Sequence, residues 1–358
     1  MNREDLKVYI QQIKPLNQGA MHQMEEYLDG LTKPVGALGK LEALMIQLAG
    51  ANGSVQFKTS PKVTVIMCSD NGVCDAGVSS CPQEVTATVT YNFTKGITAM
   101  NKLSEFAKAD LHIVDIGVKA DFKHPAIHNR KVCYGTKNMT RQPAMTEQEA
   151  LQAIAIGIAE TESLIQKGYE VFGTGEMGIG NTTTSAAITA VVLGEKVTKV
   201  TGKGSGALDT VYENKIQAIK KAIELHQPDP YDPIDVLSKV GGLDIAGLVG
   251  VYLAAAKHGK IVVIDGFIAA AAALIAYQLA PLTKSYMVAS HLSKEAGMAL
   301  VLQHIGLEPH LNLEMRLGEG SGCPILFNLL EMAQYTLLGM GTFEDAGVDK
   351  SHYMHIWK

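Results

Sequence analysis

The chain alternates between short runs of consecutive apolar residues and longer segments whose apolar residues recur at helical spacing. The runs that predict strands are Lys62–Cys68, Leu111–Ile116, Glu170–Gly173, Ile261–Ile264 and Tyr286–Ala289. Because these runs are apolar throughout rather than at alternate positions, we expect both of their faces to be buried. Such strands, separated by helical segments, predict an α/β fold with a mostly parallel sheet and helices on both faces, similar to a Rossmann fold.

The segments between the strands carry helix signals. Pro82–Phe106 is expected to be a helix, with the proline in its first turn. Thr146-Glu-Gln-Glu149 has the pattern of a capping box, which predicts a helix from there to about Lys167. A further helix is expected after Gly266, to about Leu279.

The two ends of the chain differ from its middle. Residues 1–55 contain helical patterns and no convincing strand, and the chain is again helical from Ile325 onward. We therefore expect residues 1–55 and 325–358 to form a small helical subdomain. It would pack beside an α/β domain of residues 56–324.

Composition narrows the class of protein. The net charge is −5 and no basic run is longer than Lys220–Lys221, which argues against a nucleic-acid surface and fits an enzyme with small-molecule substrates. The longest apolar runs, Ile245–Ala256 and Phe267–Tyr277, are shorter than the ~18 residues of a membrane span. Five cysteines without C-x-x-C spacing suggest a reducing cytoplasm. We expect a cytoplasmic protein with no metal site, no cofactor and no membrane or nucleic-acid partner.

The segment Gly173–Ser185 (GTGEMGIGNTTTS) follows a predicted strand and precedes a helical pattern. Glycines at such a junction let backbone N–H groups approach an anion, and the helix N-terminus favours negative charge. The segment matches neither a Walker A motif nor a dinucleotide fingerprint, because the closing Gly-Lys-Ser/Thr and the acidic ribose partner are absent. The segment therefore predicts a phosphate site with Glu176 beside it. The alternative is that it is only a tight turn between a strand and a helix.

Other polar clusters follow strand-like runs. They are Asp70-Asn-Gly72, Thr201–Gly206 after Val197–Val200, and Ser290-His291. Lys203 would add positive charge to a second phosphate-contacting loop, although Gly202–Gly206 could equally be a flexible surface loop. Since ligands bind beyond the carboxyl ends of parallel strands, these clusters predict one shared site.

Glu319 stands out because it lies in Arg316–Gly322 (RLGEGSG), with glycines on both sides. Glycines allow a bulky ligand to approach the carboxylate, and an apolar, water-poor pocket would raise its pKa toward that of a general base. The alternative is an acid that only begins a helix. Met177 and Met315 are interpreted as packing residues, and His352-x-x-His355 as a solvated helical face rather than a metal site.

Four motifs together resemble one family. They are GTGEMGIGNTTTSAAI (Gly173–Ile188), RLGEGSG (Arg316–Gly322), the pair Asp70–Val73 and Gly77–Ser79, and KPxGxLGxLE (Lys33–Glu42). The match runs in order along the chain from about residue 30 to residue 340, and it resembles nicotinate-nucleotide–dimethylbenzimidazole phosphoribosyltransferases.

The resemblance implies a reaction and a set of roles. Nicotinate mononucleotide and 5,6-dimethylbenzimidazole would give α-ribazole 5′-phosphate and nicotinate, in assembly of the cobalamin nucleotide loop. Glu319 would be the catalytic base and Glu176 a second catalytic carboxylate. By the resemblance, the 5′-phosphate would be held by Gly178, Gly180, Asn181 and Thr182. From the polar clusters described above, we expect further nucleotide contacts from Gly202, Lys203, Gly204 and Ser290. The acceptor base would be bound by another set: Ser79, Ser80, Glu84, Met177 and Leu317. The family also implies a homodimer, in which Lys33–Leu41 can reach the neighbouring subunit's site.

Two positions depart from the family pattern. Asn71 stands where many members have histidine, and Cys323-Pro324 stands where small, alanine-rich residues are common. Both are expected near the acceptor pocket, so a phenolic acceptor is an alternative to a benzimidazole. Two further alternatives are a non-catalytic nucleotide-binding subunit of a heterodimer and a Rossmann-type dehydrogenase, which the missing ribose acid disfavours.

Overall fold

The computed structural model describes residues 1–202 and 209–349, so the predicted contacts Lys203 and Gly204 lie outside the described residues. Six strands form one sheet in the order β3-β2-β1-β4-β5-β6, and every neighbouring pair is parallel. The strands are β1 (Lys62–Ser69), β2 (Ala109–Gly117), β3 (Ile127–Asn129), β4 (Val171–Met177), β5 (Ile261–Ile264) and β6 (Met287–Ala289). This confirms the predicted parallel sheet, and the strand order reverses between β1 and β4, where such sheets bind ligands.

The helices are α1 (Arg3–Ile10), α2 (Gln18–Asp29), α3 (Lys40–Asn52), α4 (Val85–Phe93), α5 (Ala99–Phe106), α6 (Glu147–Gln166), α7 (Asn181–Leu193), α8 (Val197–Val200), α9 (Asp209–His226), α10 (Pro233–Val240), α11 (Leu243–Lys257), α12 (Phe267–Leu279), α13 (Met298–Ile305) and α14 (Gly322–Gly339). Two 3₁₀ helices, η1 (Gly72–Ala76) and η2 (Pro281–Tyr286), complete the regular structure. None of the described helices is both long and apolar enough to cross a membrane.

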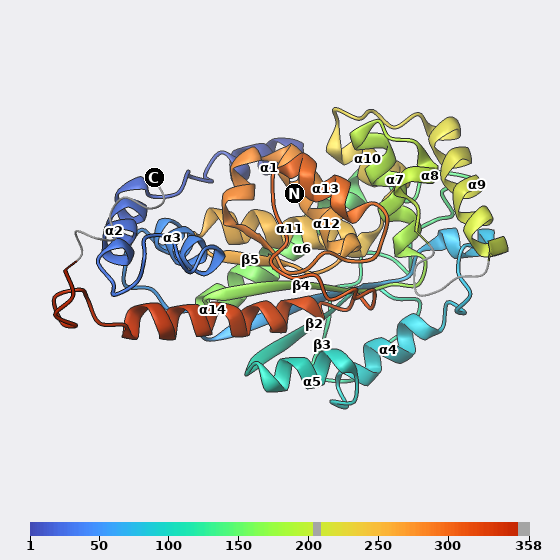
Figure 1. The fold of residues 1–358 in the computed structure, drawn as a ribbon. Helices are drawn as coiled ribbons and strands as arrows, with labels where there is room; N and C mark the ends of the chain where they lie inside the picture. Colours follow the sequence, from blue (N-terminus) through green and yellow to red (C-terminus); the bar gives the residue numbers. More distant parts are fainter. Residues whose placement is uncertain (203–208, 350–358) are drawn as a thin grey trace.

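Helices cover both faces of the sheet, as the continuous apolar strands require. Along β1, Val63, Val65 and Met67 belong to one core, whereas Ile66 and Cys68 belong to another. Helices α11 and α12 lie on the first face, with α6 beside α11, and α14, α5 and α4 lie on the second (Figure 1). Both faces of β1 are therefore covered by other side chains, and only its carboxyl end can contribute to a ligand site.

Three element predictions need correction. Pro82–Phe106 is two helices rather than one, because Gly96 takes a left-handed conformation and Thr98 caps a new helix start. Val197–Val200 is a single helical turn, α8, and not a strand. Strand β4 continues to Met177, well past the predicted end at Gly173. The capping box at Thr146 is confirmed, with Thr146 and Glu149 hydrogen-bonded reciprocally.

The glycines of β4 explain its unexpected length. A Cβ on Gly173 would lie 2.7 Å from Cys323 Cβ, and one on Gly175 would lie 2.8 Å from the Glu319 carbonyl oxygen. These two glycines therefore let the start of α14 and the segment before it lie directly on the strand. The turn proper is shorter than the motif and spans only residues 178–180, before α7 begins at Asn181.

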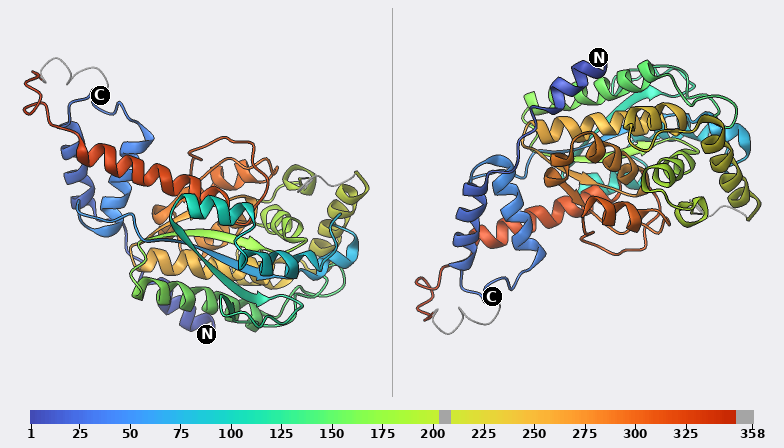
Figure 2. Two further views of the ribbon diagram at one scale, coloured as in Figure 1. Left: turned by 90° about the horizontal axis from the view of Figure 1, so that it is seen from below. Right: turned by 90° about the horizontal axis from the view of Figure 1, so that it is seen from above.

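A helical part projects from one end of the sheet, where α2 and α3 pack against the far end of α14 (Figure 2). Helix α1 does not join them. Its Arg3 donates two hydrogen bonds to Glu147 at the start of α6, of 2.7 and 2.9 Å, and its Leu6 belongs to the core of the α/β layers. The division of the chain into residues 1–55 with 325–358 and residues 56–324 stays a prediction, and α1 is the segment that departs from it.

Candidate active site

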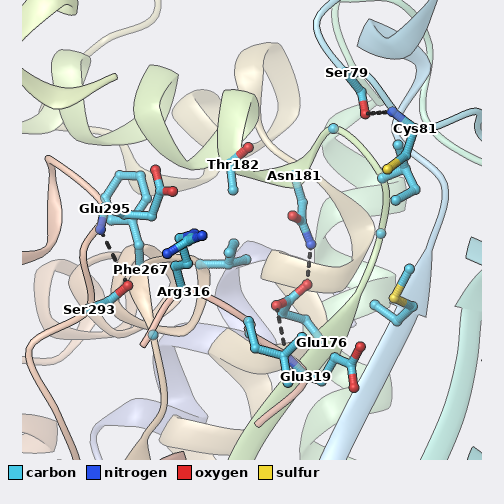
Figure 3. Close-up of a pocket in the computed structure, with 18 of the residues that line it drawn as sticks. Ser79, Cys81, Glu176, Asn181, Thr182, Phe267, Ser293, Glu295, Arg316 and Glu319 are labelled. Atoms are coloured by element: carbon cyan, nitrogen blue, oxygen red, sulfur yellow. Dashed lines mark hydrogen bonds between the residues drawn. The ribbon is translucent and has the colours of Figure 1, made fainter. Parts of the chain in front are cut away.

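A cavity of about 360 Å³ opens at the carboxyl ends of β1 and β4 (Figure 3). Its walls come from the loop after η1, the β4–α7 turn, α9, the segments that follow β5 and β6, and the segment before α14. We call Arg316–Gly322 the glutamate loop. Of the predicted site residues, the cavity is lined by Ser79, Ser80, Glu176, Met177, Gly178, Gly180, Asn181, Thr182, Leu317 and Glu319.

Three described residues of the predicted set lie outside the cavity wall. Glu84 is exposed at the N-terminus of α4 and does not line the acceptor side. Ser290 is fully buried, and its hydroxyl lies 2.9 Å from His291 Nδ1 and donates to the Asp265 carbonyl. Gly202 lies behind Lys215, with its carbonyl oxygen 3.4 Å from Lys215 Nζ. None of these three contacts the space that a ligand would fill.

Glu176 ends β4 in an almost completely buried position. Its carboxylate accepts a hydrogen bond from Asn181 Nδ2, and the same amide donates to Asp244 at 3.1 Å. Burial, followed by the nearby charge of Asp244, raises the pKa of Glu176 to about 8. The pKa of Asp244 is raised to about 6, also mainly by burial. At neutral pH the Glu176 carboxyl is therefore largely protonated, because two buried carboxylates so close together disfavour a second negative charge.

Glu319 sits in a strained part of the glutamate loop. Gly318, Glu319 and Gly320 all have positive φ, of 81°, 63° and 88°. A left-handed glutamate costs about 1 kcal/mol, so the surrounding structure must hold it in place. Two contacts do so: Asp265 accepts hydrogen bonds from the backbone N–H groups of Gly320 (3.0 Å) and Gly322 (2.6 Å).

The side chain of Glu319 is reachable from the cavity, unlike the buried side chain of Asp265 that holds its loop. It is partly buried and lines the cavity, and desolvation raises the pKa of its carboxyl above the usual range. Its backbone N–H lies 3.4 Å from Glu176 Oε1, so the two glutamates lie side by side at one end of the cavity. Glu319 is thus a desolvated carboxylate that faces the ligand space.

The opposite end of the cavity combines cations with one buried carboxylate, Glu295. Lys215 of α9 is buried, and its Nζ donates to Thr182 Oγ1 at 2.9 Å, on the first turn of α7. Desolvation lowers the pKa of Lys215, an effect that the opposite charge of Glu295 reduces. Arg316 adds a second cation at the wall. The N-terminus of α7 and these two cations form an anion-binding end, as the glycine-rich motif predicts.

Near the glutamates the wall is apolar. Val78, Val85, Val89, Met177 and Leu317 line this side, and Ser79 and Ser80 lie at its rim. A hydrophobic slot of this kind accepts a flat aromatic ring, with a few polar groups to orient it.

The two departures from the family pattern do not reach this slot. Asn71 is fully buried after β1 and does not line the cavity. Cys323 is also buried, with its thiol 3.4 Å from the Val263 carbonyl on the sheet side of α14. Asn71 nevertheless lies directly behind the wall, because a Cβ on Gly178 would be 2.9 Å from Asn71 Nδ2, so the expected position near the acceptor pocket stays a prediction.

Comparison with known proteins agrees with this geometry. Residues 13–348 match a family model described as phosphoribosyltransferase. A nicotinate-nucleotide–dimethylbenzimidazole phosphoribosyltransferase from Clostridium tetani is 47% identical over 349 residues, which cover 98% of this chain and 96% of that one. The chain belongs to this phosphoribosyltransferase family. The phosphoribosyltransferase of the same name from Halalkalibacterium halodurans is 45% identical, with 96% and 97% of the two chains covered.

The family's solved structures share the fold. The crystal structure of the phosphoribosyltransferase from Thermus thermophilus superposes with a TM-score of 0.88 at 36% identity and covers 93% of this chain and 99% of that one. The family assignment predicted from the four motifs is thereby confirmed, and with it the α/β fold.

Sequence reasoning missed several buried charges of this phosphoribosyltransferase, among them Lys215 and Asp244. Lys215 belongs to an ordinary helical pattern and carries no motif, so only the fold brings it to α7. Asp244 begins the long apolar helix α11, and a single carboxylate at the edge of an apolar run was the available signal.

Proposed function

We propose that this chain transfers the phosphoribosyl group of nicotinate mononucleotide to 5,6-dimethylbenzimidazole or a related base, giving α-ribazole 5′-phosphate and nicotinate. The donor and acceptor are those in the names of its relatives. One structural observation supports the proposal above all. A desolvated glutamate and an anion-binding end face each other across a single cavity.

The 5′-phosphate would bind at the anion-binding end. Gly178, Gly180, Asn181 and Thr182 form the turn and the first turn of α7, a helix N-terminus without a side-chain cap. Lys215 would replace its Thr182 contact with a phosphate oxygen or share it. Anchoring the phosphate there fixes the ribose, because positioning of this kind is worth several kcal/mol in a two-substrate reaction.

Glu319 would act as the base. One nitrogen of the acceptor attacks the anomeric carbon, the bond to nicotinate breaks, and its electron pair neutralises the pyridinium nitrogen. The proton on the acceptor's other nitrogen passes to the Glu319 carboxylate, which balances the reaction. Attack from the face opposite the leaving group inverts β to α. The transition state carries positive charge on the ribose, as in glycoside cleavage, so a nearby carboxylate also stabilises it electrostatically.

Glu176 would support this step without taking the proton. Its carboxyl is largely protonated at neutral pH, so Glu176 already holds a proton and the acceptor's proton is left to Glu319. The apolar wall of Val78, Val85, Val89 and Met177 would hold the acceptor ring, with Ser79 and Ser80 at its edge.

The central test is Glu319→Gln, which keeps the shape of the side chain and removes the base. We expect synthesis of α-ribazole 5′-phosphate to fall by about 10²-fold or more. Glu314→Gln is the matched control, because Glu314 is an exposed glutamate just before the glutamate loop, with positive φ like Glu319. Activity of Glu319→Gln within about tenfold of wild type would refute the role of Glu319.

The anion end has its own test. Lys215→Met should raise the KM for nicotinate mononucleotide by roughly tenfold or more, since a charge-assisted hydrogen bond contributes about 1.5–3 kcal/mol. Lys220→Met, at an exposed position of the same helix, should leave the KM unchanged. Equal KM values for the two variants would place the phosphate elsewhere.

A competition assay between two acceptors tests which of them the enzyme prefers. With equal concentrations of 5,6-dimethylbenzimidazole and a phenol, the benzimidazole product should dominate, because the relatives of this chain are named for that acceptor. Predominant phenol transfer would favour the phenolic alternative. Nucleotide binding by calorimetry, without turnover on either acceptor, would favour a non-catalytic subunit.

A homodimer is proposed from the family resemblance together with exposed apolar side chains on the projecting helices. Tyr335 is 87% and Met332 51% exposed on α14, and Tyr27 is 36% exposed on α2. Sedimentation equilibrium should give a mass near twice 38.3 kDa, and a single-chain mass would contradict the proposal.

A further inference from the structure

Two histidines and a glutamate meet on the far edge of the sheet, away from the active-site cavity. His112 lies in β2 and His128 in the edge strand β3. The register pairs Val114 with His128, so His112, two residues before Val114, projects from the same face as His128. Helix α6 covers this face and supplies Glu160. Strand register and helix packing, rather than a sequence motif, bring the three together.

Their ligand atoms are close enough for one metal ion. One nitrogen of each imidazole and one Glu160 oxygen lie within 4.8 Å of one another. Around tetrahedral Zn²⁺, with bonds of about 2.0–2.1 Å, ligand atoms lie about 3.4 Å apart. His112 Nε2 is now 2.6 Å from Glu160 Oε2, and the imidazole rings have centroids 4.1 Å apart. Ångström-scale side-chain shifts would therefore complete the geometry.

The surroundings of these three side chains also favour metal binding. No described residue hydrogen-bonds to a ring nitrogen of His128, which is unusual for a partly buried imidazole. His112 and Glu160 are both buried. Two imidazoles and a carboxylate, with one open position, form a donor set that Zn²⁺ takes readily.

We propose that His112, His128 and Glu160 bind a divalent transition-metal ion, with Zn²⁺ as the expected occupant, and that the ion ties β3 to β2 and α6. Water would take the fourth position, because His128 is only partly buried. The ion would have a structural role, since this edge of the sheet lies away from the cavity walls.

The competing arrangement is an ion-pair cluster completed by Arg130. Arg130 Nε donates to Glu160 Oε1 at 2.5 Å, and its side chain is 49% exposed. Oε1 is not the oxygen that faces His112, so Arg130 can orient the carboxylate while Oε2 binds the metal. Its positive charge opposes that of the ion. Removing Arg130 should therefore leave Zn²⁺ binding intact or tighten it.

The test is Zn²⁺ titration of metal-free, untagged protein by calorimetry, in a chain with His352→Ala and His355→Ala so that this pair contributes nothing. We expect one equivalent to bind. His128→Ala and Glu160→Gln should weaken binding by roughly tenfold or more, whereas Arg130→Ala and the exposed-histidine control His22→Ala should not. At 100-fold excess over the Kd, Zn²⁺ should raise the Tm by roughly 3 °C in the parent chain and in the two controls, but not in His128→Ala or Glu160→Gln.

A second readout does not depend on the variants folding. X-ray absorption of the Zn²⁺-loaded parent chain should give two imidazole ligands and two oxygen ligands. The proposal is overturned if the parent chain binds no Zn²⁺ at micromolar concentration, if His128→Ala binds it equally well, or if absorption shows sulfur ligands.

Discussion

The protonation of Glu176 gives the most direct physical test of the site. Its pKa is raised from 4.5 to about 8 because the carboxyl is buried beside Asp244. Between these two values the folded protein binds a proton that the unfolded chain has released. Stability must therefore fall as pH rises through this window, since the group has its full stabilising effect only below the unfolded pKa.

Glu176→Gln removes the titration and keeps the shape of the protonated side chain. The interval from 4.5 to about 8 corresponds to roughly 5 kcal/mol at about 1.4 kcal/mol for each pH unit, which is the upper limit of the effect. The variant should be close to wild type near pH 4.5 and progressively more stable than wild type up to about pH 8. Asp244 and Asp265 titrate in both proteins, so their contributions largely cancel in the difference.

The assay is urea denaturation of both proteins at pH 5, 6, 7, 8 and 9, with the difference in unfolding free energy plotted against pH. Glu147→Gln is the control, because its pKa is lowered by the hydrogen bond from Arg3 and its difference from wild type should stay constant across this range. A flat curve for Glu176→Gln would mean that Glu176 is ionised in the folded protein, and the neutral supporting role would be wrong.

Three further predictions concern the glutamate loop. Gly320→Ala should lower activity sharply and cost about 2 kcal/mol more stability than Gly168→Ala, as measured by denaturation. Both glycines have positive φ, but only at Gly320 would a Cβ lie 2.7 Å from Thr64 Cγ2; equal costs would count against the tight packing. The acid limb of kcat/KM should lie above the usual glutamate range, because burial raises the pKa of Glu319; a limb at ordinary glutamate values would contradict its desolvation. Asp265→Asn should reduce kcat by about tenfold or more with little change in the KM for nucleotide, because an amide N–H₂ would face a backbone N–H; an unchanged kcat would show that Asp265 does not hold the loop.

The sequence predicted the fold class and most of the cavity because both depend on local patterns. Continuous apolar strands imply a covered parallel sheet, and glycine-rich segments at strand ends imply a site. The glycines of β4 were misinterpreted as a turn because Gly173 and Gly175 serve a neighbouring segment that crosses the strand. A single sequence does not reveal which distant segment needs that space.

The other groups that the sequence analysis did not identify also depend on contacts between distant segments. Lys215 reaches Thr182 from a helix 33 residues later, and no periodicity in that helix marks it. His112, His128 and Glu160 meet only because β2 and β3 pair in one particular register beneath α6. Such groupings depend on tertiary packing, whereas motifs report only what is adjacent along the chain.

Helix α14 joins two parts of the molecule that are otherwise far apart. It begins at Gly322, whose N–H is held by Asp265, and its 18 residues, about 27 Å at 1.5 Å per residue, end among α2 and α3. One helix therefore carries both the N–H group that Asp265 holds beside Glu319 and the side chains that pack against α2 and α3, so the glutamate loop and the projecting helices share a single rigid element.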